Sequence, residues 1–143
     1  MFRLLLIVIL LPLTANAKVD PKELHCMKVA LHHEARGEGV KGKQAVANVI
    51  MNRVRSRQFP NTVCGVVFQR NRNGCQFSWY CDPRIGTRPV NVSDSTKRTA
   101  MNVLNNPNRD VTGGALWFHS GRLPHWASSK TETRRIGGHI FYR

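Results

Sequence analysis

The 143-residue chain carries 22 Lys and Arg against 8 Asp and Glu, a formal net charge of +14. Its length provides for one domain and excludes two of ordinary size. The charge will hold the protein at polyanionic surfaces, which include nucleic acids and the anionic polymers of cell walls, so charge alone does not select a partner.

The first seventeen residues have the pattern of a secretory signal peptide. Arg3 precedes an uninterrupted apolar run from Leu4 to Leu11, and residues 14–17 offer the small side chains of a cleavage site. The run is about half of the ~20 residues that span a bilayer, so no stable membrane insertion is expected. We therefore expect a signal peptide over 1–17, a domain over 18–143, and export to the periplasm or cell wall. An uncleaved anchor is the alternative.

The cysteines agree with export, because an even number in a short exported chain is typical of disulfide bonds. Four cysteines allow three pairings. The short spacing between Cys75 and Cys81 favours a local disulfide, which would leave Cys26 with Cys64. No Cys-x2-Cys pair is present, so a zinc site is not expected, and no other cofactor is implied. Export also argues against a nucleic-acid partner.

Capping residues and apolar spacing predict three helices. The first runs from about 21 to 36, with Asp20 as its cap and Glu23 reaching back in a capping box. A second helix is expected over about 43–55. A third begins near Ser93 and ends before residue 107.

The remaining segments are shorter and less regular. Residues 63–68 are apolar and of undecided type, and residues 70–87 are expected to form a loop rich in Gly, Asn and Arg. Two strand-like runs, 115–119 and 139–142, flank a polar loop over 120–135. The prediction is a single, mainly α (α+β) domain with a small β-element.

Glu34 is the most informative residue, because it extends the apolar stripe of the first helix beyond Met27 and Leu31. A carboxylate there faces the body of the protein, and it lies at the negative end of the helix dipole. Both effects raise a carboxyl pKa, and a protonated carboxyl near neutral pH suits a glycosidase acid. A structural ion pair with one of the many arginines is the alternative.

Other catalytic patterns are absent from the sequence. His33-Glu34 resembles the start of a zinc-protease helix, but the second histidine of H-E-x-x-H is missing. There is no G-x-S-x-G elbow and no phosphate-binding loop. Glu38 lies past the helix end, where an exposed surface role is the default.

The motifs resemble the cell wall hydrolase family that takes its name from the spore cortex-lytic enzyme SleB. The resemblance spans nearly the whole chain after the signal segment in ordered blocks: His33 to Glu38, Gly42 to Val49, Asn52 to Val54, Phe59 to Gln69, Cys75 to Ser78, Ala115 to His119, and Gly138 to Tyr142. Cys26 and Cys64 are similar to those of Gram-negative members, which favours their pairing. The chain departs from the family at His32-His33, where relatives often carry Tyr-Phe.

This resemblance implies a fold related to lysozymes and lytic transglycosylases, and peptidoglycan as substrate. It implies Glu34 as the catalytic acid/base, and cleavage between N-acetylmuramic acid and N-acetylglucosamine. No second acid declares itself as a nucleophile, so a lytic transglycosylase route to a 1,6-anhydro product is favoured over a muramidase-type hydrolase.

Aromatic faces that can stack on sugars, and polar groups that can bind N-acetyl substituents, supply the candidate substrate contacts. They are Glu38, Gln76, Phe77, Trp79, Trp117, His119, His139 and Tyr142. Strand alternation would turn either Trp117 or its neighbour Phe118 into the core. His139 and Tyr142 are three residues apart, so in a regular strand they face opposite ways.

Three other interpretations remain. A phage endolysin would use the same chemistry in another setting. A non-catalytic wall-binding protein would use only the basic surface, which is expected to attract anionic cell-wall polymers in any case. Glu34 within an intact motif argues against such a binding protein. A secreted nucleic-acid binder would share the charge, and it would show a salt-dependent shift of DNA that survives competition with peptidoglycan.

Overall fold

The computed structural model describes residues 17–86 and 88–143, so all but the last residue of the expected signal peptide lies outside the described residues. The helices are α1 (Pro21–Ala35), α2 (Val40–Arg55), α3 (Val63–Val67), α4 (Ser78–Cys81), α5 (Asp94–Asn105) and the 3-10 helix η1 (His125–Ser129). The strands are β1 (Arg70–Asn71), β2 (Gly74–Cys75), β3 (Trp117–Ser120), β4 (Glu132–Ile136) and β5 (His139–Tyr142). No described helix is long and apolar enough to cross a membrane.

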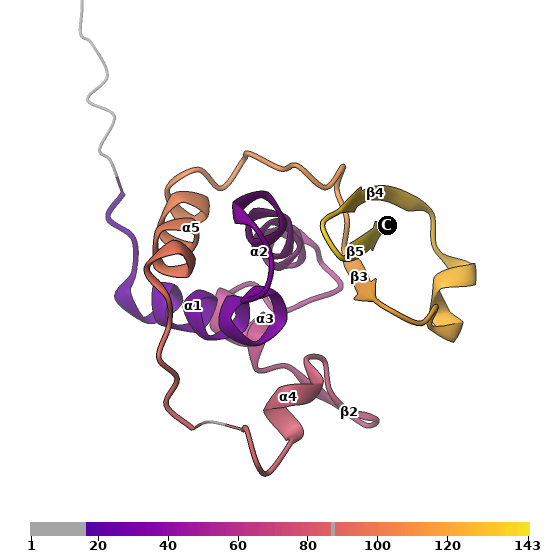
Figure 1. Ribbon diagram of the computed structural model, residues 1–143, viewed down its shortest axis with the longest axis horizontal. Coiled ribbons are helices and arrows are strands. Elements are labelled where there is room, and N and C mark those ends of the chain that lie inside the picture. The colour runs from indigo at the N-terminus through magenta and orange to yellow at the C-terminus, as the bar shows by residue number, and fades with distance from the viewer. Residues whose placement is uncertain (1–16, 87) are drawn as a thin grey trace, which may run out of the picture.

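A helical body and a small sheet lie side by side (Figure 1). Helices α1, α2, α3 and α5 pack on one another, and the C-terminal strands form an antiparallel sheet in the order β3–β5–β4. The core joins both parts, because Met27 and Leu31 of α1, Val49 and Ile50 of α2, and Phe141 of β5 are all fully buried. The expected mainly α (α+β) domain is confirmed.

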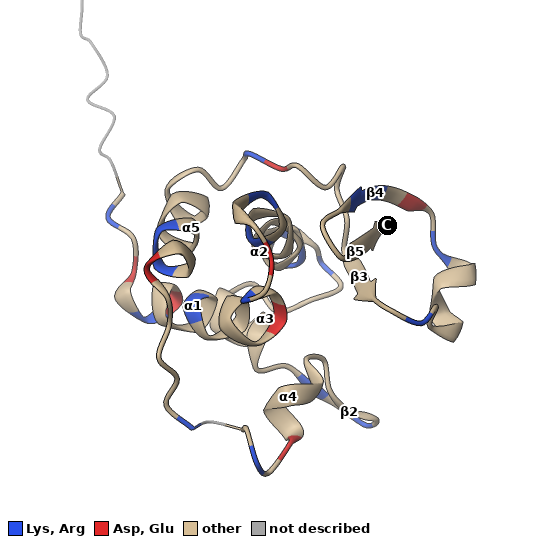
Figure 2. Cartoon of the chain, viewed as in Figure 1, with Lys and Arg blue, Asp and Glu red and all other residues tan. Residues whose placement is uncertain are grey.

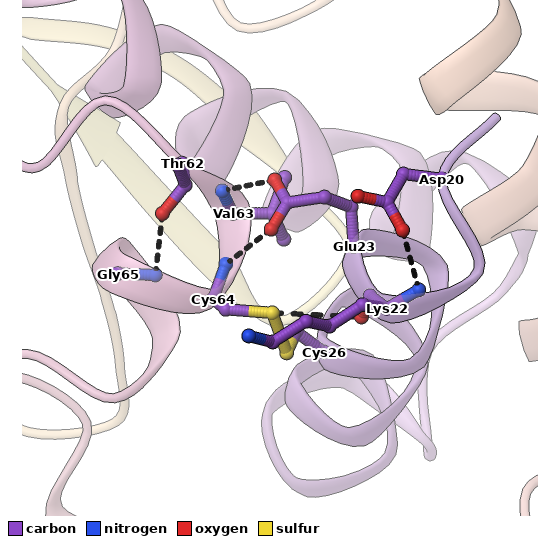
Figure 3. The surroundings of a disulfide bond; sticks show 8 residues. All are labelled: Asp20, Lys22, Glu23, Cys26, Thr62, Val63, Cys64 and Gly65. Carbon is purple, nitrogen blue, oxygen red and sulfur yellow. Dashed lines mark hydrogen bonds between the residues drawn. A yellow bond between two sulfur atoms is a disulfide. The ribbon is translucent and has the colours of Figure 1, made fainter.

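The start of α1 is built differently from the predicted capping box. Asp20 caps the helix as expected, accepting a hydrogen bond from the backbone N–H of Lys22 at 2.8 Å. The Glu23 carboxylate does not reach back to its own helix. It accepts from the backbone N–H groups of Val63 and Cys64, at 2.6 and 3.2 Å, and so caps the first turn of α3 (Figure 3).

Two disulfide bonds complete this framework. Cys26–Cys64 ties α1 to α3 beside the Glu23 cap, and Cys75–Cys81 closes the segment that carries β2 and α4 (Figure 3 shows the first). These are the two pairs expected from the sequence.

Asparagines of α2 hold the segment that leads into the sheet. The Asn48 side chain donates to the Arg109 carbonyl at 2.8 Å and accepts from the Val111 N–H at 3.0 Å. One turn on, Asn52 donates to the Ala115 carbonyl at 3.0 Å. These bonds explain two polar positions on a largely buried helix, since they satisfy backbone groups that the core would leave unpaired.

Several expected boundaries and loops are wrong. Helix α2 begins at Val40, three residues before the expected start, because Gly39 serves as its N-cap. The predicted loop 70–87 contains the β1–β2 hairpin and α4. The predicted polar loop 120–135 contains η1 and most of β4, which pairs with β5.

Candidate active site

A groove with a volume of about 360 Å³ opens between the helical body and the sheet. It is bounded by the end of α1, by α2, by the β2–α4 elbow, by β3 and by η1. The lining residues are His33, Glu34, Arg53, Gln76, Phe77, Ser78, Trp117, Phe118, His119, Ser120, Trp126 and His139.

Glu34 is the only acid among the lining residues of the described chain. Burial raises its pKa to about 7, because the ionised carboxylate loses water that the protein does not replace. The indole N–H of Trp79 and the charge of Arg53 act in the opposite direction and lower the pKa less than burial raises it. The indole N–H is a loose donor, outside the geometry of an ordinary hydrogen bond. Glu34 is therefore poised to give and take a proton near neutral pH.

Arg53 is the buried cation beside this acid. Its Nε donates to the Leu116 carbonyl at 2.8 Å, and its guanidinium lies 5.0 and 5.3 Å from the ring centres of Phe59 and Phe77. Burial lowers its pKa to about 10 and Glu34 raises it, so Arg53 is charged at neutral pH. From the sequence, Arg53 was placed only within the motif block Asn52 to Val54 and was given no role. Its position three and four residues after buried Ile50 and Val49 was the signal that it faces inward.

His33 and Trp79 form the wall next to Glu34. Their rings stack at 4.4 Å with an interplanar angle of 25°. Burial, followed by the nearby charge of His32 and then Arg36, lowers the pKa of His33, so the ring is mainly neutral at neutral pH. His33 was not among the substrate contacts expected from the sequence, and the structure places it in the groove lining. Trp79, one of the expected contacts, is buried behind it.

The β2–α4 elbow contributes Gln76, Phe77 and Ser78, and the Cys75–Cys81 disulfide spans it. Gln76 and Phe77 therefore lie where the sequence analysis expected them. Ser78 was missed because it is a common polar residue in a segment that was expected to be a loop.

Strand β3 contributes side chains from both of its faces. Phe118 packs edge-on to His139 with ring centres 5.2 Å apart, and both line the groove. Trp117 also lines the groove, where the Lys130 ammonium lies 3.7 Å from the centre of its ring. Phe118 packs against the core, with its ring centre 5.9 Å from that of fully buried Phe141, and Trp117 does not, so the expected division holds although Phe118 also stays partly exposed in the groove.

Tyr142, an expected substrate contact, does not line the groove. Its ring stacks on His119 at 5.6 Å, and its hydroxyl is hydrogen-bonded to His119 Nε2 at 3.0 Å. Trp126 packs edge-on against both rings, which completes a cluster of three aromatic side chains. Tyr142 thus supports His119, while His139 lies on the opposite face of β5, as the odd spacing predicted.

Glu38, also an expected substrate contact, is turned away from the groove. Its carboxylate accepts from the Gly138 N–H at 3.1 and 3.3 Å and lies 3.2 Å from His139 Nδ1. It therefore fastens the α1–α2 connection to the turn between β4 and β5. The default expectation of an exposed carboxylate is wrong as well, since only 19 % of the Glu38 side chain is exposed.

The groove is rich in buried polar atoms that lack a partner in the described part of the protein. They include His33 Nε2, Arg53 Nη1 and His119 Nδ1. Buried polar atoms are normally hydrogen-bonded, so a group of such atoms without partners in one groove suits a ligand with many hydroxyl and amide groups. Among the described residues, no three His, Cys, Asp or Glu side chains are grouped so as to hold a metal ion.

A family model described as Cell Wall Hydrolase matches residues 37–142. The chain belongs to the cell wall hydrolase family. The spore cortex-lytic enzyme of Bacillus cereus is 34% identical over 121 residues, which cover 83% of this chain and 43% of that protein. The Bacillus subtilis enzyme is 30% identical, with 83% and 37% covered. The chain therefore spans less than half the length of these relatives.

Two solved structures have the same fold. The catalytic domain of the Bacillus cereus SleB protein superposes with a TM-score of 0.70 at 31% identity, covering 88% of this chain and 93% of that domain. The catalytic domain of the germination-specific lytic transglycosylase SleB from Bacillus anthracis gives the same TM-score and identity, with 93% and 100% covered. This chain therefore corresponds to the catalytic domain of the family.

Proposed function

We propose that the protein cleaves the glycan strand of peptidoglycan between N-acetylmuramic acid and N-acetylglucosamine, as a lytic transglycosylase. One observation carries the proposal: a single carboxyl group, with a pKa raised to about 7, lies in a polar groove of the family's catalytic fold. The family model begins at residue 37, so the role of Glu34 rests on its geometry.

Glu34 acts first as an acid in this proposal. Its proton passes to the glycosidic oxygen, the bond from that oxygen to the muramyl C1 breaks, and the N-acetylglucosamine side leaves as an alcohol. Arg53 then faces the carboxylate that has formed, and its charge limits the cost of that carboxylate in a desolvated site.

Glu34 then acts as a base. The carboxylate removes the proton of the muramyl 6-hydroxyl, whose oxygen bonds to C1 and gives the 1,6-anhydro product. This step restores the protonated acid. A two-carboxylate hydrolase needs a second acid about 5 to 9.5 Å away, and the lining residues of the described chain include no other acid. That observation favours the single-carboxylate route over a muramidase-type hydrolase.

Gln76, Phe77, Trp117, His119 and His139 are the proposed substrate contacts, and Arg53 and His33 join them from the structure. Trp117 is partly exposed and offers a ring face to a sugar, whereas Phe77 is buried beneath Arg53 and forms part of the groove wall. The histidines and Gln76 offer hydrogen-bonding groups to the N-acetyl substituents. Glu38 and Tyr142 leave this set, because they hold His139 and His119 from behind.

The proposed site of action is the periplasm or cell wall. Lys and Arg outnumber acids on the helices and connecting segments (Figure 2), which supports attraction to anionic wall polymers. Two disulfide bonds support an oxidising compartment. A Gram-negative or phage setting stays a prediction, as does the signal peptide over 1–17.

Digestion of purified peptidoglycan, followed by mass spectrometry of the products, tests the proposal. Wild type and an exposed-acid control, Glu132→Gln, are expected to release 1,6-anhydro-muramyl products, and Glu34→Gln none. Reducing muramic ends would instead establish a hydrolase in which water attacks C1. Binding to the wall without cleavage by wild type would leave the non-catalytic alternative.

A further inference from the structure

A second hollow, with a volume of about 540 Å³, lies between α1, α5 and the segment that joins α4 to α5. Its lining residues on α1 are His25, Lys28 and Val29. With 3.6 residues per turn, these positions are rotated about 120 to 180° from Glu34 around the helix axis. The hollow is therefore separate from the catalytic groove and shares no residue with it.

The rim of the hollow is cationic. Lys28 of α1, Arg88 of the connecting segment and Lys97 of α5 converge on it from three parts of the chain, and no acid is among its lining residues in the described structure. Lys28 and Arg88 make no ion pair with the described residues, and Lys97 has only an exposed pair with Asp94 at 3.4 Å. Asp94 partly offsets the charge of Lys97, and Asp82 lies near enough to interact with Arg88, but the rim keeps a net positive charge that favours an anion.

The floor of the hollow is apolar. The half-buried Val29, Phe68, Val90 and Val92 line it, exposed Pro89 lies at its edge, and Phe68 packs on the Tyr80 ring with centres 4.8 Å apart. A bare phosphate chain or a sugar-phosphate polymer would neutralise the positive charges of the rim but would leave the apolar floor without a contact. An anion that carries small alkyl groups would satisfy both.

We propose that this hollow binds a peptide carboxylate flanked by small apolar side chains, namely the stem peptide of peptidoglycan. This assignment rests on the proposed function, in which peptidoglycan is the substrate. Stem peptides are short, carry alanine methyl groups and present free carboxylates. Because the hollow and the groove face different sides of α1, the peptide bound here belongs to wall material beside the strand being cut. Such a second contact raises the effective concentration of glycan at the groove.

Binding is tested by ¹H–¹⁵N NMR with diacetyl-L-Lys-D-Ala-D-Ala as probe. The expected result is a shift of the Val29, Val90 and Val92 amide signals. Amidation of the peptide carboxyl, or the Lys28→Gln/Lys97→Gln double variant, is expected to weaken binding roughly fivefold or more, since partly exposed ion pairs contribute modestly. The control Lys41→Gln/Arg57→Gln removes two exposed charges elsewhere and is expected to bind as wild type. Equal binding of the amidated peptide, or shifts confined to the groove, would overturn the proposal.

Kinetics separate this proposal from the proposed function. On intact peptidoglycan the Lys28→Gln/Lys97→Gln variant is expected to raise KM several-fold with kcat unchanged, and on glycan strands stripped of peptides to match wild type. A variant that is equally impaired on stripped strands would contradict the second site. Failure of wild type to cut intact peptidoglycan would count against the glycan-cleaving function, while the NMR result stands by itself. Polyphosphate that shifts the same amides while the peptide shifts none would replace the peptide with a phosphate polymer and overturn the assignment.

Discussion

Glu38 and His139 meet at the edge of the groove, with the carboxylate Oε1 3.2 Å from the imidazole Nδ1. The same carboxylate accepts from the Gly138 N–H, so one side chain from the α1–α2 connection fixes the turn that begins β5. Burial lowers the pKa of His139, Glu38 raises it, and His119 lowers it further. Glu38 therefore both positions a groove residue and adjusts its charge.

Glu38→Gln is expected to lower the pKa of His139 further, because the negative charge that raises this pKa is lost. Glu38→Ala is expected to cost about 1–3 kcal/mol of stability as well, since a hydrogen bond to a charged, largely buried group is removed. Titration of the His139 ring signals by NMR and urea unfolding measure the two effects. Glu132→Gln, which breaks an exposed pair with Arg135, is the control. An unchanged His139 pKa in Glu38→Gln would contradict the pairing.

Gly137 is required by the same contact. A Cβ added there would overlap the Glu38 Oε2, and the residue has a φ of +57° that other residues rarely adopt. Gly137→Ala is therefore expected to destabilise the protein by about 1–3 kcal/mol. Part of this loss is expected to disappear in a Glu38→Ala background, where only the backbone strain remains. Strict additivity of the unfolding free energies in the double-mutant cycle would show that the added Cβ does not clash with the Glu38 side chain.

The sequence predicted correctly the helix starts that depend on a capping side chain next to the helix. Ser93 caps α5, and Asp20 caps α1, at the residues where the side-chain chemistry indicated. Glu23 also fitted the capping-box pattern, but its carboxylate instead accepts hydrogen bonds from two backbone N–H groups at the start of α3, far away in the sequence. Strand β4 was missed because its sequence, Glu-Thr-Arg-Arg-Ile, is polar, and an edge strand owes its structure to pairing with β5 rather than to alternation.

The candidate site likewise contains residues that local sequence patterns predict and residues that only tertiary contacts place there. Glu34 was predicted from its place on the apolar stripe of a helix, and the candidate substrate contacts from side-chain chemistry that suits sugars. The structure places Glu34 and five of these candidates in the groove lining: Gln76, Phe77, Trp117, His119 and His139. Which of two nearby polar residues faces the groove depends on tertiary contacts. Glu38 and Tyr142 were therefore misassigned, and Arg53, Ser78 and Trp126 were missed.

The two disulfide bonds are expected to contribute unequally to stability and to activity. Cys26–Cys64 spans 38 residues and Cys75–Cys81 spans 6, so loop-closure entropy predicts about 4 and about 2 kcal/mol respectively. Paired alanine variants, compared by urea unfolding, test the order. Loss of Cys75–Cys81 is expected to reduce cleavage more than its stability effect explains, because the β2–α4 elbow carries Gln76 and Phe77. A reversed order of stability would contradict the chain-entropy account.

Arg53→Gln is expected to raise the pKa of Glu34 above about 7, because the cation that stabilises its carboxylate is removed. Titration of ¹³C-labelled glutamate carboxyl signals measures this directly, and the alkaline limit of cleavage is expected to move to higher pH. Arg53→Lys keeps the charge and is expected to restore most of the wild-type titration. Arg55→Gln lies on the same helix but is exposed, and it is expected to leave Glu34 unchanged. A Glu34 titration unaffected by Arg53→Gln would show that the charge does not reach the carboxyl.

Glu34 makes stability depend on pH with a definite sign. Its pKa is about 7 in the folded protein against 4.5 for the unperturbed group, so the folded state holds the proton more tightly than the unfolded chain does. Wild type is therefore expected to lose stability as pH rises from about 4.5 through about 7, by on the order of 3 kcal/mol. The amide side chain of Glu34→Gln cannot ionise, so the excess stability of this variant over wild type is expected to grow across that window and to level off above it.

Urea unfolding of both proteins at pH 4.5, 6, 7 and 8.5 measures the difference in stability. Glu132, whose pKa is lowered from 4.5 by its hydrogen bond to Arg135, changes stability mainly below about pH 4.5, so Glu132→Gln is the control that is expected to differ from wild type by a nearly constant amount over this range. A constant difference between Glu34→Gln and wild type over this range would mean that the carboxyl is not desolvated, and the acid role proposed for it would lose its physical basis.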